Sequence, residues 1–141
     1  MSASEAAMSS DEPPEPPLDK AALPDGVIVA RDATGEALYT ARAFAAGDTV
    51  FRFLNVSWRP ERDRHTVEHP DGRFFFDPVL ARTAHSCDPN CRLSTDLMAM
   101  IALRDIRVGE PITFDYATTE STIRYPFTCM CGAPNCRGQI R

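Results

Sequence analysis

From residue 26 onward the chain consists of short apolar or alternating stretches, each bounded by residues that favour turns. Such short stretches are typical of β-strands, because alternation places every second side chain on the same face of a sheet. The predicted strands span residues 26–30, 36–43, 49–56, 73–76, 97–103 and 111–114. Turn signals such as Ala46-Gly47-Asp48 and Pro70-Asp71-Gly72 separate them. We therefore expect a mainly β domain built from several small sheets.

The first 23 residues differ in composition and are expected to form a disordered acidic tail. Alanine, serine, glutamate and proline dominate them, and residues 13–17 hold four of the twelve prolines of the chain. A segment this polar cannot bury enough apolar surface to offset the entropy lost on ordering. Docking of its proline-rich run to a partner is the alternative.

The tail also holds most of the net charge. Residues 1–20 carry five acidic side chains and one lysine, which leaves the rest of the chain close to neutral. Binding to nucleic acid needs a concentrated excess of lysine and arginine, so we expect no direct nucleic acid partner. The first residues lack the basic start of a signal peptide, and the longest plain apolar run, residues 97–103, is too short to span a membrane. These features predict an intracellular protein of the cytoplasm or nucleus, without membrane association.

Five cysteines in a chain with no export signal are expected to be reduced thiols rather than disulfides. Three of them, Cys129, Cys131 and Cys136, lie close together near the C-terminus. Zinc binds four ligands tetrahedrally, so a distant cysteine, either Cys87 or Cys91, is needed to complete a site. Buried or redox-active thiols are the alternative.

Two histidines offer a second metal hypothesis. His65 and His69 would share one face of a helix and act as paired ligands. The Pro70-Asp71-Gly72 turn that follows favours a strand and a turn instead.

A turn at Gly109-Glu110 leads into a strand with two aromatic residues. On strand geometry Phe114 and Tyr116 point to the same face. Taken alone, the pair is explained as part of the hydrophobic core.

Three motifs, in this order along the chain, resemble those of SET-domain protein lysine methyltransferases with a post-SET zinc segment. They are His85-Ser86-Cys87-Asp88-Pro89-Asn90, then Gly109-Glu110-Pro111-Ile112-Thr113-Phe114-Asp115-Tyr116, then the three C-terminal cysteines with Gly132 and Arg137-Gly138. A weaker match lies upstream, at residues 35–42 and 46–48. The resemblance covers roughly residues 26–141. It implies a β-clip-like SET domain over residues 24–120 with a C-terminal pseudoknot, followed by a zinc-bound segment over residues 121–141.

The resemblance also implies an activity. Members of the family transfer a methyl group from S-adenosylmethionine to a lysine side chain of a protein, with cofactor and peptide on opposite sides of a narrow channel. By the match, Tyr116 is the catalytic tyrosine that aligns amine and methyl, and Phe114 limits the volume of the channel. A lysine has a pKa near 10.4, so burial among aromatic rings would help by disfavouring its ammonium form. The expected substrate is a lysine in a protein or peptide, such as a histone or another basic tail.

The same match assigns the cofactor and metal residues. Contacts to S-adenosylmethionine are implied for Gly35, Ala37, Leu38, Tyr39, Ala84, His85 and Asn90. Asn90 also braces the pseudoknot. Zinc ligands are implied to be Cys87, Cys129, Cys131 and Cys136, which leaves Cys91 spare.

The sequence departs from the family pattern at several positions. Ala84 stands where the family usually has asparagine, Ala37 replaces the second glycine of the first motif, and Ala81 replaces an arginine. The segment 53–80 is too short for the helical insert that forms one wall of the peptide groove. We therefore predict weak cofactor binding.

The alternative function is a catalytically silent SET-like zinc module that binds a peptide or protein partner. A third interpretation, a zinc-ribbon nucleic acid binder, is disfavoured by the absence of a basic block.

Overall fold

The computed structural model describes residues 23–32, 35–62, 65–119, 127–129, 131 and 133–140. In this part of the chain the strands are β1 (Val27–Asp32), β2 (Gly35–Thr40), β3 (Thr49–Arg52), β4 (Ser57–Arg59), β5 (Val67–Glu68), β6 (Phe74–Phe76), β7 (Ala84–His85), β8 (Cys91–Ser94), β9 (Ala99–Ala102), β10 (Thr113–Phe114), β11 (Phe127–Thr128) and β12 (Gln139–Ile140). Two short 3-10 helices, η3 (Leu80–Arg82) and η4 (Tyr116–Thr118), accompany them. Residues 1–22 of the predicted tail lie outside the described residues.

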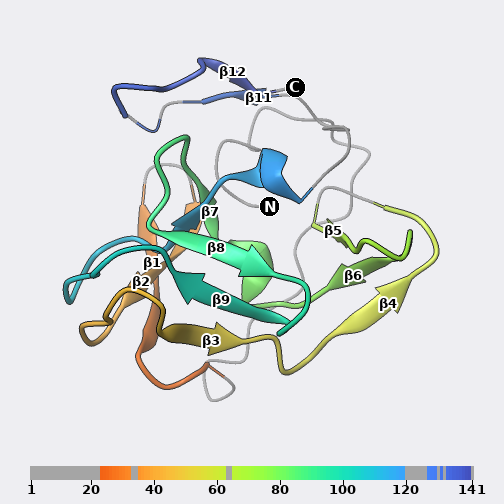
Figure 1. The fold of residues 1–141 in the computed structure, drawn as a ribbon, viewed down its shortest axis with the longest axis horizontal. Coiled ribbons are helices and arrows are strands. Elements are labelled where there is room, and N and C mark those ends of the chain that lie inside the picture. The colour runs from red at the N-terminus through yellow and green to blue at the C-terminus, as the bar shows by residue number, and fades with distance from the viewer. Residues whose placement is uncertain are drawn as a thin grey trace.

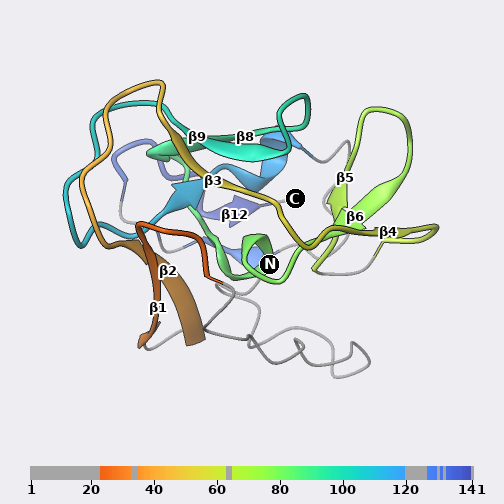
Figure 2. The ribbon, with the colours of Figure 1, turned by 90° about the horizontal axis from the view of Figure 1, so that it is seen from below.

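The described strands form five small sheets arranged around one core (Figures 1 and 2). The sheets are β1–β2, β3–β9–β8, β4–β6–β5, β7–β10 and β11–β12. In Figure 1 the β1–β2 hairpin lies on the left, β4–β6–β5 on the right and β11–β12 at the top. The mainly β fold predicted from the sequence is therefore confirmed.

Each of the six predicted stretches contains a strand, though the ends differ by several residues. The longest plain apolar run becomes β9, the central strand of its sheet, and all four of its residues are buried. The strands that the pattern did not predict are β4, β5, β7, β8, β11 and β12, most of which have two or three residues. Pairs this short carry too little sequence signal, because tertiary contacts rather than local propensity form them.

The favoured interpretation around the two histidines is correct. Val67 and Glu68 form β5, which pairs with β6, and a turn follows over residues 70–72. His65 and His69 are not on one helical face, and neither belongs to the group of possible metal ligands found among the described residues.

The pairing that organises the fold joins β7 to β10 in parallel. Ala84 lies opposite Thr113, and His85 lies opposite Phe114. The chain between the two strands contains the β8–β9 hairpin. The short β7–β10 pairing therefore brings together two segments that are far apart in sequence. The segment 84–91 thereby lies against residues 111–116, and also contacts the C-terminal residues 135–137. This juxtaposition is the one that a C-terminal pseudoknot requires.

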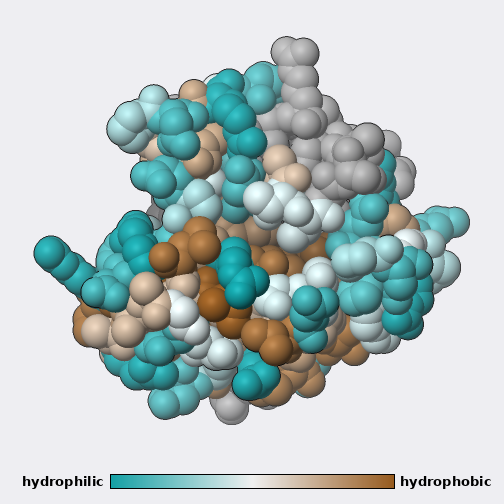
Figure 3. Space-filling view, viewed as in Figure 1, coloured by the Kyte–Doolittle hydropathy of each residue, from teal (hydrophilic) through white to brown (hydrophobic). Residues whose placement is uncertain are grey.

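Side chains from all the larger sheets meet in one core. Leu38 of β2, Phe75 of β6, Met100 of β9 and Phe114 of β10 are fully buried in it. Sheets this small bury little surface alone, so shared burial is what holds them together. Hydrophobic residues also gather across the middle of the face seen in Figure 3, with hydrophilic residues around them.

Candidate active site and metal centre

Tyr116 lies at the point where the two central motifs meet. Its ring centroid is 5.1 Å from that of Phe114 and 5.0 Å from that of His85. The prediction that Tyr116 continues the strand was wrong, because β10 ends at Phe114 and Tyr116 begins η4. Asp115 causes the change, since its carboxylate caps the helix by accepting from the backbone N–H of Ala117 at 3.0 Å. The two aromatic rings are nevertheless neighbours.

The hydroxyl of Tyr116 is held by the backbone. It donates to the carbonyl oxygen of Thr83 at 2.7 Å, while Tyr116 as a whole is 5% exposed. The backbone N–H of Tyr116 donates to Nδ1 of His85 at 3.1 Å. The tyrosine is therefore fixed at both ends by the segment that contains β7.

His85 is a buried neutral imidazole. Burial lowers its pKa to about 4, although the nearby carboxylate of Asp115, 3.7 Å from Nδ1, acts in the opposite direction. Because Nδ1 accepts from Tyr116, the neutral ring is assigned its proton on Nε2. Nε2 lies 3.5 Å from Sγ of Cys87, so this imidazole links the candidate active site to the cysteine cluster.

The cofactor candidates of the first motif lie on β2. Gly35 has a φ of +123°, a conformation that glycine adopts readily, and Tyr39 is half-buried. Ala37 and Leu38 are buried, and the carbonyl of Leu38 accepts from the backbone N–H of Ile112 at 2.9 Å. β2 therefore packs directly beside the strand that leads to the tyrosine.

Ala84 and Asn90 lie on the other side of that strand. Ala84 is half-buried on β7. Asn90 is buried, and its side chain accepts from the backbone N–H of Thr113 at 3.0 Å and donates to the carbonyl of Pro111 at 2.8 Å. Asn90 therefore fixes the spacing of the two segments, while its place in cofactor binding stays a prediction.

A partly buried ion pair connects η3 with β2, and sequence reasoning missed it. The guanidinium of Arg82 in η3 lies 3.2 Å from the carboxylate of Glu36 in β2, with the Arg82 side chain 2% exposed and that of Glu36 33% exposed. Arg82 also donates to the carbonyl of Pro78 at 2.7 Å. The residues are 46 positions apart, so no local pattern connects them.

We expect Glu36→Gln to lower the free energy of unfolding by about 2 kcal/mol, because it leaves the Arg82 charge buried beside a weaker partner. The figure is below that for a fully buried pair, since Glu36 is partly exposed. Urea unfolding of Glu36→Gln, Arg82→Met and the double variant gives the coupling energy. Additive effects of the two substitutions would contradict a direct interaction.

The structure brings together Cys87, Cys129, Cys131 and Cys136. Their four Sγ atoms all lie within 4.8 Å of one another, and those of Cys87 and Cys129 are 3.9 Å apart. Four sulfur ligands at about 2.3 Å from one zinc ion in a tetrahedron lie about 3.8 Å apart. The four thiols therefore fit a structural zinc site, and a cluster without histidine or carboxylate favours zinc over hard cations.

The thiols differ in acidity. Burial raises the pKa of Cys129 to about 12. Burial acts in the same direction on Cys131, but hydrogen bonds from the backbone at Cys87 and Ala133 and from the other two thiols of the C-terminal cluster together lower the pKa of Cys131 to about 6. Since the thiolate is the form that binds metal, Cys131 is ready as a ligand at neutral pH.

Cys91 is not part of the cluster. It lies on β8, is fully buried in the core, and burial raises its pKa to about 12. It therefore behaves as a small apolar side chain.

The C-terminal segment is tied to the site by two residues that were not assigned a role from the sequence. Asn135 donates from its side chain to the carbonyl of Cys87 at 2.9 Å. Arg137 donates from its backbone to Sγ of Cys87 and from its guanidinium to Asp115, at 3.5 and 2.7 Å. Arg137 thus connects the cysteine cluster with the carboxylate that caps the Tyr116 helix.

Residues 35–117, more than half of the chain, match the family model of the SET domain. The chain therefore belongs to the SET-domain family. It is 44% identical over 62 residues to a histone-lysine N-methyltransferase, H3 lysine-4 specific, of Schizosaccharomyces pombe, a match to 40% of this chain and 6% of that protein. It is 31% identical over 100 residues to the H3 lysine-9 specific histone-lysine N-methyltransferase KMT1 of Fusarium mangiferae, a match to 55% of this chain and 29% of that protein.

The fold is also similar to that of solved structures. A crystal structure of KRYPTONITE in complex with mCHG DNA and SAH aligns with a TM-score of 0.64 and 25% identity, covering 82% of this chain and 29% of that one. A second, in complex with mCHH DNA, H3(1-15) peptide and SAH, aligns with a TM-score of 0.61 at 24% identity and supports the fold alone. This chain spans less than a third of the length of the relatives described here. In its described part, no helix has both the length and the apolar character that crossing a membrane requires.

Proposed function

We propose that this protein transfers a methyl group from S-adenosylmethionine to a lysine side chain of a protein substrate. The observation that carries the proposal is the buried tyrosine between Phe114 and His85, whose hydroxyl is anchored to the Thr83 carbonyl. The relatives named histone-lysine N-methyltransferases and a structural neighbour solved with SAH support it. By the same reasoning, residues 24–120 form the catalytic domain and residues 121–141 a zinc-bound segment.

The first requirement of the reaction is a neutral amine. Deprotonating a lysine with a pKa of about 10.4 at pH 8 requires roughly 3.3 kcal/mol. Phe114 and Tyr116 are 0% and 5% exposed, so an amine that reaches these two rings is removed from water. Loss of hydration disfavours the ammonium and thereby supplies part of that energy.

The second requirement is alignment. Because the hydroxyl of Tyr116 donates its hydrogen bond to the Thr83 carbonyl, its oxygen would act toward the substrate amine as an acceptor of an N–H. Such a contact would orient the amine, and S-adenosylmethionine, when bound, would supply the methyl group. His85 keeps the tyrosine in this position through the backbone hydrogen bond to Nδ1.

The cofactor is proposed to lie along β2 and β7, which hold Gly35, Ala37, Leu38, Tyr39, Ala84 and His85. Leu38 acts by positioning, because the whole residue is buried and its carbonyl already accepts from Ile112. Asn90 acts by positioning, since its side chain already bonds to residues 111 and 113. Ala84 has only a methyl group, whereas an asparagine amide at this position would add a polar contact to the cofactor. The affinity for S-adenosylmethionine is therefore expected to be weak.

Ala84→Asn is expected to tighten S-adenosylmethionine binding at least tenfold, because a hydrogen bond to a charged group is worth about 1.5 to 3 kcal/mol. Residue 84 is half-buried rather than enclosed in the core. Isothermal titration calorimetry of both forms measures the change. Ala84→Leu, similar in size but without the amide, is the control and should not tighten binding; equal affinity of the asparagine and leucine variants would contradict the expected contact.

A zinc-loaded sample, radiolabelled S-adenosylmethionine and a set of lysine peptides test the activity itself. Peptides from histone tails are the first choice, because a structural neighbour was solved with an H3(1-15) peptide. Label on lysine supports the proposal. Loss of all labelling at every peptide concentration, with the cofactor shown to bind, would overturn it.

The second candidate function is a silent module that binds a peptide without transferring a methyl group. Ala84 and Ala37 favour it, since both depart from the residues that usually contact the cofactor. Peptide binding that persists while calorimetry detects no S-adenosylmethionine binding would select this function. A nuclear or cytoplasmic location and the lack of a nucleic acid partner remain predictions of the sequence.

A further inference from the structure

The short helix η4, which begins with Tyr116, is held largely by Asp115. The carboxylate of Asp115 accepts from the backbone N–H of Ala117 at 3.0 Å. Its carbonyl accepts from the backbone N–H and from the hydroxyl of Thr118, at 3.0 and 2.7 Å. A helix of three residues is not stable by itself. The position of η4 therefore depends on how Asp115 is oriented.

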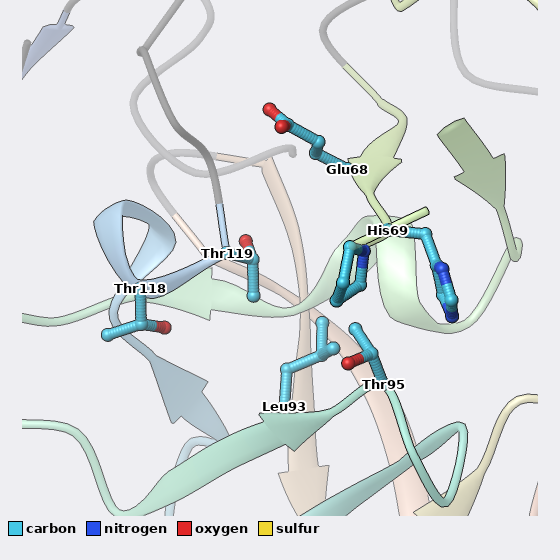
Figure 4. A pocket seen from close by; sticks show the side chains of 7 residues that line it. Glu68, His69, Leu93, Thr95, Thr118 and Thr119 are labelled. Carbon is cyan, nitrogen blue, oxygen red and sulfur yellow. The ribbon is translucent and has the colours of Figure 1, made fainter. Parts of the chain in front are cut away.

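One side of η4 is not close-packed. Thr118 and Thr119 line a pocket of about 140 Å³, whose other walls include Leu93 of β8 and Glu68 of β5 (Figure 4). Open space of this kind supplies no van der Waals contacts that would hold the helix on that side. The hydrogen bonds to Asp115 therefore matter more for η4 than they would for an element enclosed in the core.

The carboxylate of Asp115 has one charged partner. The guanidinium of Arg137 donates to it at 2.7 Å, and the Asp115 side chain is only 17% exposed. Nδ1 of His85 lies 3.7 Å away, but this imidazole is neutral because burial lowers its pKa to about 4. Within the described residues, Arg137 therefore balances the Asp115 charge alone, through a charge-assisted hydrogen bond of the stronger kind.

The contact between Asp115 and His85 is unfavourable without that charge. Nδ1 of His85 accepts from the backbone N–H of Tyr116, so it presents no proton to the carboxylate. Two acceptor atoms 3.7 Å apart, one of them charged, repel each other. A partly buried carboxylate without a partner is expected to turn toward water, because burying an unpaired charge is costly. Such a rotation would break its hydrogen bond to Ala117 and release the start of η4.

Arg137 is itself anchored outside η4. Its backbone N–H donates to Sγ of Cys87 at 3.5 Å, and the neighbouring Asn135 donates to the carbonyl of Cys87 at 2.9 Å. The guanidinium thus extends from a separately fixed segment to the carboxylate that caps η4. It reaches Tyr116 through Asp115.

We propose that Arg137 is a positioning residue for Tyr116, which balances the charge of Asp115 and so keeps this carboxylate in place as the cap of η4. The inference rests on the proposed function, because the exact position of Tyr116 matters for catalysis only if the tyrosine orients the substrate amine. The role belongs to the guanidinium and is separate from metal binding by the neighbouring thiols.

Arg137→Gln in the zinc-loaded protein provides the first test. We expect kcat for the best-labelled lysine peptide to fall at least tenfold with little change in KM, because the tyrosine shifts while the peptide contacts stay. Amide hydrogen exchange of Tyr116 and Ala117, followed by NMR, should become at least tenfold faster. Zinc content should stay at about one per chain. Arg137→Lys keeps the positive charge and should retain most of the activity.

Asp115→Asn, added to Arg137→Gln, separates charge balance from a simple link between segments. Asparagine still offers an oxygen that caps the helix but carries no charge. If the unbalanced carboxylate is what displaces η4, the double variant should recover slow exchange and most of the lost kcat. If Arg137 only ties the C-terminal segment to the domain, the double variant should be no better than Arg137→Gln.

Arg104→Gln is the matched control, because Arg104 forms another partly exposed ion pair, with Glu110 at 3.4 Å. It makes the same change of charge and should leave kcat and the exchange of Ala117 unchanged. Unchanged exchange in Arg137→Gln, loss of its zinc, or no recovery with Asp115→Asn would overturn the positioning role and leave the proposed function intact. Faster exchange that Asp115→Asn reverses, in a protein that methylates no peptide, would support the positioning of Tyr116 and overturn the proposed function.

Discussion

Cys87→Ser is expected to abolish zinc binding and to unfold the C-terminal segment. Cys87 lies 42 residues before Cys129, so its thiolate joins two distant parts of the chain through the metal. Structural zinc sites contribute on the order of 10 kcal/mol in apparent binding energy. Metal analysis of the purified variant should give no zinc against about one per chain in the parent, together with a much lower melting temperature.

Methylation should fall with the metal, because the anchored C-terminal segment reaches the catalytic turn. Arg137 contacts both Cys87 and Asp115, and Asp115 caps the helix that begins with Tyr116. A chelator added to the parent protein should reproduce the loss of activity, and zinc should restore it.

Cys91→Ala is the matched control. Cys91 is fully buried in the core and lies outside the cluster, so its removal leaves a small cavity but no missing ligand. The variant should keep its zinc with a modest loss of stability. Retained zinc in Cys87→Ser with loss in Cys91→Ala would reverse the ligand assignment.

Tyr116→Phe is expected to reduce methylation at least a hundredfold, since misplacing reacting groups by about 1 Å has an effect of that size. The variant keeps the ring between Phe114 and His85 but loses the hydroxyl that would orient the amine. Stability should fall by about 1 to 3 kcal/mol, because the buried carbonyl of Thr83 loses its donor. Single-turnover kinetics and thermal melts separate the two effects.

Phe114→Tyr distinguishes a channel residue from a core residue. Phe114 is fully buried, so a new hydroxyl must find a partner in the channel or remain unsatisfied. If the channel assignment is correct, turnover persists and mass spectrometry shows a shift toward monomethyl-lysine. If both aromatic residues belong to the core alone, Tyr116→Phe keeps full methylation and Phe114→Tyr changes stability with no change of product.

The sequence by itself determined the β character of the chain and indicated the residues that we propose carry its chemistry. Alternating stretches and turn residues are local signals, so every predicted stretch contains a strand. Residues adjacent in sequence also suffice to recognise three motifs: the one around His85, the one that ends in Tyr116, and the three C-terminal cysteines. For the fourth thiol, composition and spacing left Cys87 and Cys91 equivalent, and the family resemblance alone favoured Cys87.

Tertiary structure decided the features that depend on residues far apart in sequence. Cys91 lies in β8 and packs into the core, while Cys87 precedes that strand and lies beside Cys129, which separates two thiols only four residues apart. The Arg82–Glu36 pair, the Thr83 carbonyl that receives the tyrosine hydroxyl, and the pocket beside η4 likewise arise from contacts between distant segments. Such contacts leave no local pattern, because their energy comes from shared burial and from hydrogen bonds formed once the β7–β10 pairing is in place.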